Sequence, residues 1–477
     1  MTNTDKTRTM LRGIVPIVVG LLIAMIPTPG GLSSNAWYFF ALFAAVIVGV
    51  ITEPIPAAAV GLIGVVIGAI SGLVVSGASG SVSWALGGFS NTTVWLIFAA
   101  YMFAVGYIKT GLGKRAALLL IKRLGKRTLG LGYAIAISDL VLSPFTPSNT
   151  ARSAGTIYPV ISNIPALYGS QPGETARKIG SYLMYTALAA TCVTSSMFLT
   201  SMAPNILAAA LAGTALKIST QWVTWFLGFL PVGIVLFFAV PVLLYKIYPP
   251  EIKSSPEAPK WASEQLDAIG KVTRRELTLL GLVILALVLW IGGTQYLDAT
   301  TTAVLVVALM VVLRVVSWED VIGNRQAWNV LIWFATLVTM ADGLARVKFV
   351  DWVTTLIEPS LKGLNLLLAI VLIVGLFYVL HYFFASITAH VTALFPVFLA
   401  LAIKVPGLTP SAWALLLSYT LGLIGILTPY GTGPSPIYYG SGYIKGRDMW
   451  VYGAVLGTLF FLVYILIGVP WILFLKL

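Results

Sequence analysis

Long apolar runs dominate the chain, and short polar or basic segments separate them. Each run can cross the hydrocarbon core of a bilayer as one helix, because about 20 residues suffice. Barrel strands would show short segments of alternating polarity, whereas these runs are continuous. The pattern predicts an all-α polytopic membrane protein with about 11 transmembrane helices. The clearest runs lie near 14–27, 36–52, 57–75, 92–108, 180–216, 222–248, 277–296, 300–316, 328–344, 412–427 and 450–475.

Two further apolar stretches carry polar residues at their centres, around 129–167 and 364–402. Basic segments mark the cytoplasmic side of a membrane protein. The basic segments of this chain all fall on one side only if both stretches are re-entrant hairpins that return to the side they enter from. We therefore expect a cytoplasmic N-terminal tail with the first helix (1–35), a first repeat (36–248), a cytoplasmic linker (249–276) and a second repeat (277–477).

Composition agrees with a membrane location, because 58% of the residues are hydrophobic and only 9% are charged, against about 25% charged in soluble domains. The formal charge of +13 does not indicate nucleic-acid binding, since Lys and Arg cluster between apolar runs as topology signals do. One cluster, 109–127, has seven basic residues and no acidic one, which predicts an amphipathic helix on the cytoplasmic surface. The N-terminal tail lacks a small-residue cleavage site, so we expect no cleaved signal peptide. Cys192, the single cysteine, can form no disulfide within the chain.

The two hairpin centres share a motif. SNTAR at 148–152 and SITAH at 386–390 both read S-x-T-A-basic, and an aromatic-Pro-Val triplet follows each. A broken apolar run comes next in both halves, with Pro204-Asn205 in the first and Pro434-Ser435 in the second. Two motif pairs in the same order, in stretches that enter from opposite sides, predict the inverted repeat of secondary transporters.

Such tips have a defined chemistry. A backbone that turns inside the membrane must find partners for its N–H groups or line a wet cavity, and helix N-termini attract anions. Two tips meeting at mid-depth would hold a small molecule with two anionic groups, although Ser and Thr in membrane helices can also bond only to neighbouring carbonyls. The repeated context favours substrate binding. The predicted substrate-binding residues are Ser148, Asn149, Thr150, Pro204, Asn205, Ser386, Ile387, Thr388, Gly433 and Pro434.

Arg152 and His390 occupy the same position in the two motifs, four residues after each serine. A charge within the membrane is expensive, at about 2.5–3.5 kcal/mol on lenient scales, and a bound anion would stabilise it. We therefore predict that both residues compensate the charge of the substrate. The alternatives are that Arg152 simply pairs with Asp139 and that His390 is a neutral buried hydrogen-bonding group. We assign His381 to the flank of its hairpin, without a function.

The sequence contains no motif of an enzyme, such as HExxH, GxSxG or a phosphate-binding GxxxxGK[ST]. We predict no cofactor and no metal site. SNTAR, SITAH, the Pro-Asn break and the segment GTGPSPIYYGSGYI resemble the divalent anion:sodium symporter family over essentially the whole chain. The similarity is greatest to its bacterial branch of 2-oxoglutarate/malate translocators and citrate/succinate or tartrate/succinate antiporters.

The resemblance implies a homodimer in the bacterial inner membrane, with tips that bind carboxylates and a transport part that moves like an elevator. It also implies sodium binding beside the tips in sodium-coupled members. This chain has Ile387 where those members carry asparagine, and an apolar side chain cannot ligate sodium. We therefore expect sodium-independent exchange of di- or tricarboxylates. A sodium- or proton-coupled dicarboxylate symporter is the alternative, and the tip chemistry also fits sulfate or phosphate.

Overall fold

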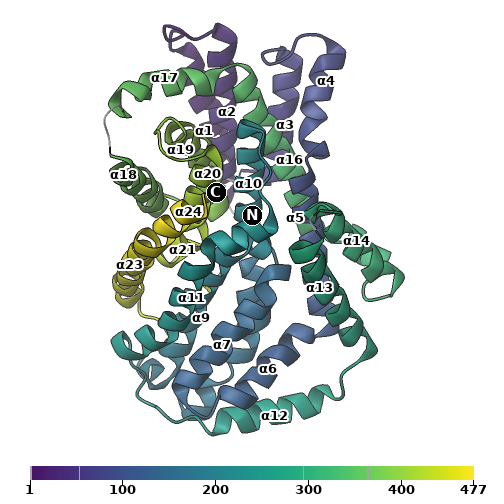
Figure 1. Cartoon of the computed structure of the whole chain (residues 1–477), viewed down its shortest axis with the longest axis vertical. Coiled ribbons are helices and arrows are strands. Elements are labelled where there is room, and N and C mark those ends of the chain that lie inside the picture. The colour runs from purple at the N-terminus through teal and green to yellow at the C-terminus, as the bar shows by residue number, and fades with distance from the viewer. Residues whose placement is uncertain (1–2, 53, 294, 362–364, 477) are drawn as a thin grey trace.

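The computed structural model of the chain describes residues 3–52, 54–293, 295–361 and 365–476 (Figure 1). Helices dominate, and the described residues form no β-strand beyond an isolated bridge between Arg127 and Ser254. Eight described helical segments are long and apolar enough to cross a membrane, with shorter apolar helices beside them. The predicted all-α polytopic fold is confirmed. The eight segments are Ser34–Thr52, Thr92–Thr110, Thr128–Phe145, Trp222–Ile247, Arg274–Gly292, Arg325–Arg346, Leu366–Phe383 and Gly446–Leu475.

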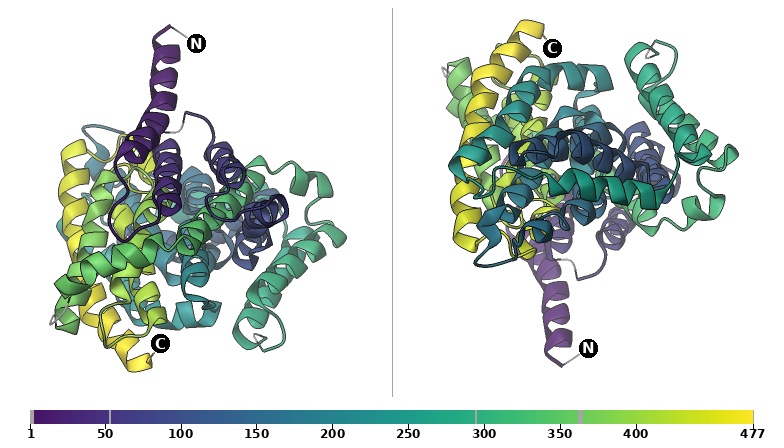
Figure 2. Two further views of the ribbon diagram at one scale, coloured as in Figure 1. Left: turned by 90° about the horizontal axis from the view of Figure 1, so that it is seen from above. Right: turned by 90° about the horizontal axis from the view of Figure 1, so that it is seen from below.

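A first helix group is built around α16 (Arg325–Arg346), which packs on α3 (Ala57–Ser71) and α5 (Thr92–Thr110). Figure 1 shows most of this group at the right of the molecule, and Figure 2 shows α1 projecting beyond the other helices. The stretch between α3 and α5, which falls between two of the apolar runs, contains α4. The remaining helices of the group are α1 (Asn3–Met25), α2 (Ser34–Thr52), α4 (Ala78–Gly87), α13 (Arg274–Gly292), α14 (Ala299–Val312) and α15 (Trp318–Ile322).

Helices α5 and α16 begin in the same way. Asn91 caps α5 and Asn324 caps α16, each accepting a hydrogen bond from the backbone amide three residues further on. This contact satisfies one of the free N–H groups of a first turn. A shorter helix follows each of them, α6 (Leu112–Leu124) after α5 and α17 (Phe349–Leu361) after α16. The two helices thus occupy equivalent places in the two predicted repeats.

A second helix group surrounds α9 (Gly180–Met197), all 18 residues of which are buried. Helices α7 (Thr128–Leu142), α11 (Trp222–Ile247) and α21 (Thr420–Leu423) pack against it. A helix covered on every side can carry polar residues only if their hydroxyls find partners. Three hydroxyl groups of α9, those of Thr191, Thr194 and Ser195, accept hydrogen bonds from Arg152. The group also contains α10 (Ala203–Leu216), α18 (Leu366–Val379), α19 (Ile387–Ala402), α20 (Pro410–Ser418), α22 (Ser435–Gly440), α23 (Gly446–Val463) and α24 (Val469–Leu475).

The predicted linker, 249–276, is largely helical and packed. Its helix α12 (Glu257–Ile269) lies along α6, as Figure 1 shows at the lower end of the molecule. The expected amphipathic helix in 109–127 is α6, and its apolar face packs on α7 and α12. Ala117, Leu118 and Ile121 are the buried apolar residues of α6, whereas Leu119 and Leu124 are exposed.

A buried ion pair joins α6 to the start of α13. Thr273 and Glu276 form a capping box at that start, in which each side chain accepts the other residue's backbone amide. The Glu276 carboxylate also accepts a hydrogen bond of 2.6 Å from Arg115, which donates to the Gly270 carbonyl as well. Arg115 thus ties α6, which packs on α7 of the second helix group, to α13 of the first.

Candidate functional site

Both predicted polar tips are breaks between helices. The first follows α7, where a short turn (Ser143–Phe145) leads through Pro147 to a π-helix, η3 (Thr150–Ile157). Proline lacks the N–H that a helix needs, which favours a break at this position. The Ser148 hydroxyl accepts the amide of Ala151 at 3.1 Å and caps the new helix.

The second tip follows α18 and a short 3₁₀ turn, η7 (Leu380–Phe383). Ser386 has extended backbone angles, and α19 begins at the next residue. The broken runs downstream are also present. The turn η6 (Leu199–Ser201) separates α9 from α10, and an irregular segment separates α21 from α22. Whether the two hairpins re-enter the membrane from opposite faces stays a prediction.

The two tips and the two breaks meet in one cavity of about 190 Å³, called the small cavity below. Eight of the ten predicted substrate-binding residues line it: Ser148, Asn149, Thr150, Pro204, Ser386, Ile387, Thr388 and Gly433. The Asn149 amide also donates a hydrogen bond of 2.8 Å to the Thr432 hydroxyl, which joins the first tip to the second break. Residues more than 230 positions apart in sequence thus share one small space.

Three helix N-termini face the small cavity. The first residues of η3, α10 and α19 are Thr150, Ala203 and Ile387, and all three line it. The N-terminal turn of a helix carries free N–H groups and a partial positive charge, which together bind anions. No charged side chain occurs among the described residues of the lining. The cavity is therefore suited to an anion held by dipoles and hydroxyl groups.

Two lining residues come from the first helix group, and the sequence analysis missed both. Tyr101 on α5 and Gln326 on α16 line the small cavity, as does Ser148 of the first tip. Tyr101 is a hydroxyl within a strongly apolar run, which is a weak signal. Gln326 belongs to no repeated motif. The small cavity therefore lies between the two helix groups.

Asn205 and Pro434 do not line the small cavity, so that substrate binding by these two residues stays a prediction. Asn205 is fully buried, and its amide donates to the carbonyl groups of Ser195 and Phe198 at 2.7 and 3.0 Å. It secures the break between α9 and α10 from behind. Pro434 is buried next to Gly433 and precedes the first residue of α22.

Arg152 is also buried behind the first tip, with 0% of its surface exposed. Its Nε donates to the Asp139 carboxylate at 3.0 Å. Its Nη1 donates to the carbonyl of Thr146 in the tip at 3.1 Å and to that of Ser201 in the break at 2.6 Å. Its Nη2 donates to hydroxyl groups of α9, those of Thr191, Thr194 and Ser195.

The guanidinium therefore clamps the first tip to the first break. Asp139 balances its charge, so the expectation that Arg152 presents an uncompensated charge to a bound anion is not what the structure shows. The pairing with Asp139, considered above as the alternative, is the observed arrangement. A role of Arg152 in transport stays a prediction.

His390 likewise lies behind its tip and does not line the small cavity. Its ring is fully buried and contacts Phe377, Phe384 and His381, with ring centroids 4.3, 5.3 and 5.1 Å away. Neither ring nitrogen has a hydrogen-bond partner among the described residues. His381, left without a function above, shares a hydrogen bond of 2.7 Å between its Nε2 and the carbonyl oxygen of Gly431 in the second break. The second half thus uses a pair of histidines where the first uses Arg152.

The fold and the small cavity are those of a multi-pass membrane transporter, with broken helices that meet between two helix groups. Residues 7–477 match the family model described as "Sodium:sulfate symporter transmembrane region". The chain belongs to this family, the divalent anion:sodium symporters, as the motifs predicted.

Two curated relatives are named "L-tartrate/succinate antiporter", one from Shigella sonnei (strain Ss046) and one from Escherichia coli (strain K12). Each is 47% identical to this chain over 473 residues, which cover 96% of this chain and 97% of the relative. Both relatives are transporters, which agrees with the prediction that this protein is not an enzyme.

Two solved structures share the fold. The YdaH transporter of Alcanivorax borkumensis has a TM-score of 0.55 at 15% identity, covering 81% of this chain and 88% of that chain. MtrF of Neisseria gonorrhoeae has a TM-score of 0.55 at 12% identity, covering 97% and 94%. At these identities the likeness concerns the fold alone.

Proposed function

We propose that this protein exchanges one small dicarboxylate for another across the bacterial inner membrane, without sodium. L-Tartrate and succinate are the first pair to test, because the relatives carry those names. Other di- and tricarboxylates are further candidates. The observation that carries the proposal is the meeting of two S-x-T tips and three helix N-termini in one cavity that has no charged side chain among its described lining residues.

The size of the small cavity supports a small substrate. At about 190 Å³ it is below the roughly 300–1,000 Å³ of pockets for drug-sized ligands. In the proposed complex the first tip, with Ser148, Asn149 and Thr150, binds one carboxylate. The second tip, with Ser386 and Thr388, binds the other. Partners at both ends favour a molecule with two carboxylates over a single small oxyanion such as sulfate.

The same residues support exchange over sodium coupling. The side chain of Ile387 has no atom that can ligate sodium. The carbonyl groups of Thr146 and Ser201, beside the first tip, already accept hydrogen bonds from Arg152. Two groups that could serve as cation ligands are thereby occupied by a side chain of the protein itself.

We also propose how the protein sits and moves. The N-terminus and the linker with α12 face the cytoplasm, since the basic segments lie on that side. The second helix group carries the tips and slides against the first group like an elevator, and two copies of the chain form a dimer. The location of the small cavity between the groups supports this division.

The test is counterflow with purified protein in liposomes. We expect labelled L-tartrate to enter liposomes loaded with succinate but not empty ones, at the same rate in sodium and potassium buffers. Competition by malate, 2-oxoglutarate, citrate and sulfate would define the range. Uptake into empty liposomes driven by a sodium or proton gradient would instead establish the symporter alternative.

Hydroxyl variants connect this activity to the small cavity. We expect Thr388→Val to reduce exchange at least about tenfold. Valine has no hydroxyl group, so the substrate carboxylate would lose one of its hydrogen-bond partners. Thr278→Val is the matched control, since the Thr278 hydroxyl bonds only to its own helix at the Arg274 carbonyl. Equal exchange in both variants would show that the second tip does not bind the substrate.

A further inference from the structure

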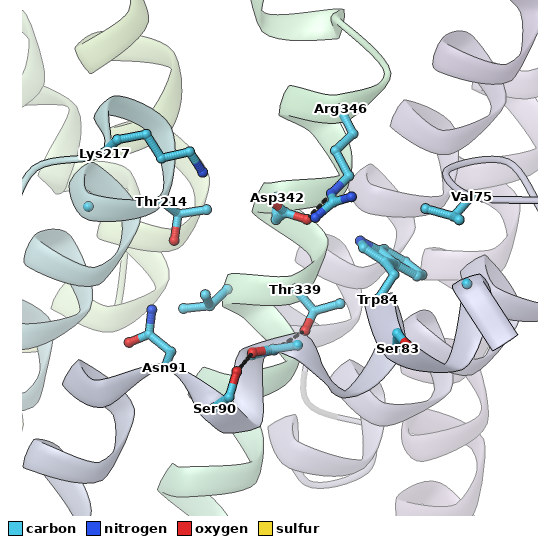
Figure 3. A pocket seen from close by; sticks show the side chains of 15 residues that line it. Val75, Ser83, Trp84, Ser90, Asn91, Thr214, Lys217, Thr339, Asp342 and Arg346 are labelled. Atoms are coloured by element: carbon cyan, nitrogen blue, oxygen red, sulfur yellow. Dashed lines mark hydrogen bonds and ion pairs between the residues drawn. The ribbon is translucent and has the colours of Figure 1, made fainter.

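A larger cavity, of about 580 Å³, lies apart from the small one and is called the outer cavity below. Figure 3 shows side chains reaching into it from several elements. Thr214 and Lys217 come from the end of α10, and Thr339, Asp342 and Arg346 come from the last turns of α16. Asn91, the cap of α5, lies at its base. Neither the motifs nor the small cavity account for this space.

The outer and small cavities lie at opposite ends of the same two helices. The first residues of α10, Ala203 and Pro204, line the small cavity, whereas Thr214 lines the outer one. With a rise of 1.5 Å per residue the two ends are about 16 Å apart. Gln326 in the first turn of α16 lines the small cavity, and the end of that helix lines the outer one. The outer cavity therefore lies between α10 of the second helix group and α16 of the first, at the ends of these helices away from the small cavity.

Positive charge exceeds negative charge in the outer cavity. Arg346 donates to Asp342 across one helical turn, with an N–O distance of 2.5 Å, and 55% of the Arg346 side chain is exposed. Lys217 ends α10 with a left-handed backbone (φ 57°) and forms no ion pair with any described residue. Figure 3 shows Lys217 extending from α10 towards the side on which Arg346 lies. Two cations thus face one carboxylate.

The repeat gives the outer cavity a counterpart. The first turn of α16, which follows the cap Asn324, reaches the small cavity through Gln326. The equivalent start of α5, with the cap Asn91, reaches the outer cavity. In an inverted repeat such equivalent places lie on opposite faces of the membrane. The outer cavity would then open to the membrane face opposite the start of α16, and an anion from that face would pass through it on the way to the tips.

We propose that the outer cavity is a collecting site for carboxylate anions on the periplasmic face, where Lys217 and Arg346 bind the substrate before it reaches the tips. The proposal rests on the proposed exchange of dicarboxylates. An excess of one sign of charge in a cavity raises the local concentration of an oppositely charged ligand and its rate of association, by about 10- to 1,000-fold in strong cases. The site acts on capture rather than on translocation.

The experiment measures exchange from each face separately, in right-side-out and inverted membrane vesicles at low ionic strength. We expect Lys217→Gln and Arg346→Gln each to raise the KM for L-tartrate about three- to tenfold at the periplasmic face, with kcat unchanged. The cytoplasmic face should keep the wild-type KM. Added salt should raise the wild-type KM and narrow its difference from the variants, because it screens the charges.

Two further variants separate charge from structure. Asp342→Asn removes the only carboxylate among the described residues that line the outer cavity. It should therefore lower the periplasmic KM, an effect opposite to that of damage to the fold. Lys404→Gln is the control. Lys404 is exposed and lines a neighbouring cavity, but not this one. Its KM should equal that of the wild type at both faces.

Three results would overturn the proposal. The first is a wild-type KM in both Lys217→Gln and Arg346→Gln. The second is an equal rise of the KM of these variants at both membrane faces. The third is a rise of the periplasmic KM in Asp342→Asn. Active exchange with such values would leave the proposed function standing. If wild-type vesicles show no exchange of dicarboxylates at all, the proposed function itself fails.

Discussion

Removal of Arg152 should destabilise the protein chiefly through Asp139, which would keep its charge in a buried site. Arg152→Met retains much of the side-chain volume and deletes the guanidinium. At the observed separation of 3.0 Å, Coulomb's law with an effective dielectric of about 20 gives about 5.5 kcal/mol for the pair. Losing one partner of a buried pair typically costs about 3–5 kcal/mol. We expect Arg152→Met to lower the free energy of unfolding by about 3–5 kcal/mol.

The double variant makes this prediction specific. Asp139→Asn neutralises the stranded carboxylate with little change of shape. The variant Arg152→Met/Asp139→Asn should therefore lose at least about 2 kcal/mol less than the sum of the two single losses. The loss of stability that remains in the double variant should come from the carbonyl groups of Thr146 and Ser201, which would no longer accept hydrogen bonds from Arg152.

The measurement is denaturant unfolding in detergent, followed by tryptophan fluorescence, because Trp222 and Trp225 are buried near the first break and donate hydrogen bonds to Thr200 and Ser196. Lys260→Met is the control. Its pair with Glu257 is exposed, and such surface pairs contribute about 0–1 kcal/mol. A coupling energy below about 0.5 kcal/mol between Arg152 and Asp139 would refute the reasoning.

Three further predictions concern other parts of the chain. Gly433→Ala should abolish exchange but leave the protein folded, because the new methyl group would overlap the Thr150 hydroxyl; tartrate counterflow and a thermal melt check the two halves of this statement. Gln326→Leu should raise the KM for L-tartrate about tenfold and that for succinate much less, since only tartrate has hydroxyl groups that would lose a partner; equal KM ratios would exclude the contact. The hydrogen bond from Lys109 lowers the pKa of the Asp320 carboxyl. The stability that the ionised carboxylate contributes is therefore present above the ordinary pKa of an aspartate and is lost as the pH falls through the lowered pKa of the folded protein. Asp320→Asn should thus cost less than about 1 kcal/mol at pH 7 and nothing near pH 2, as unfolding at the two pH values would show.

The apolar runs predicted most spans closely, because a bilayer fixes the length of a helix and leaves the backbone few alternatives. The run at 222–248 became α11 (Trp222–Ile247) and that at 36–52 became α2 (Ser34–Thr52). Packing overrode local preference elsewhere. The stretch that forms α4 is rich in Gly and Ser and reads as a loop, yet it is helical against α3 and α16.

The tips were predictable from the repeat, since one motif in two places gives two halves of one site. Asn205 was not, because it adjoins Pro204 in sequence while its side chain turns to the opposite side of the break. Tyr101 and Gln326 come from α5 and α16, elements that only the tertiary fold brings to the small cavity. Arg152 was placed near the site by its motif, but only the structure distinguishes its partner Asp139 from a bound anion.

The neutral lining of the small cavity has a consequence for energy coupling. Because Asp139 cancels the charge of Arg152, the proposed moving site contributes no charge there beyond that of its cargo. Exchange of two dianions would move no net charge, so the membrane potential would neither drive nor oppose it. Exchange of a trianion for a dianion would move one charge, worth about 2.3 kcal/mol per 100 mV. The fluorescence of a voltage-sensitive dye should therefore not change during tartrate–succinate exchange, and it should change when trianionic citrate replaces one of the two substrates.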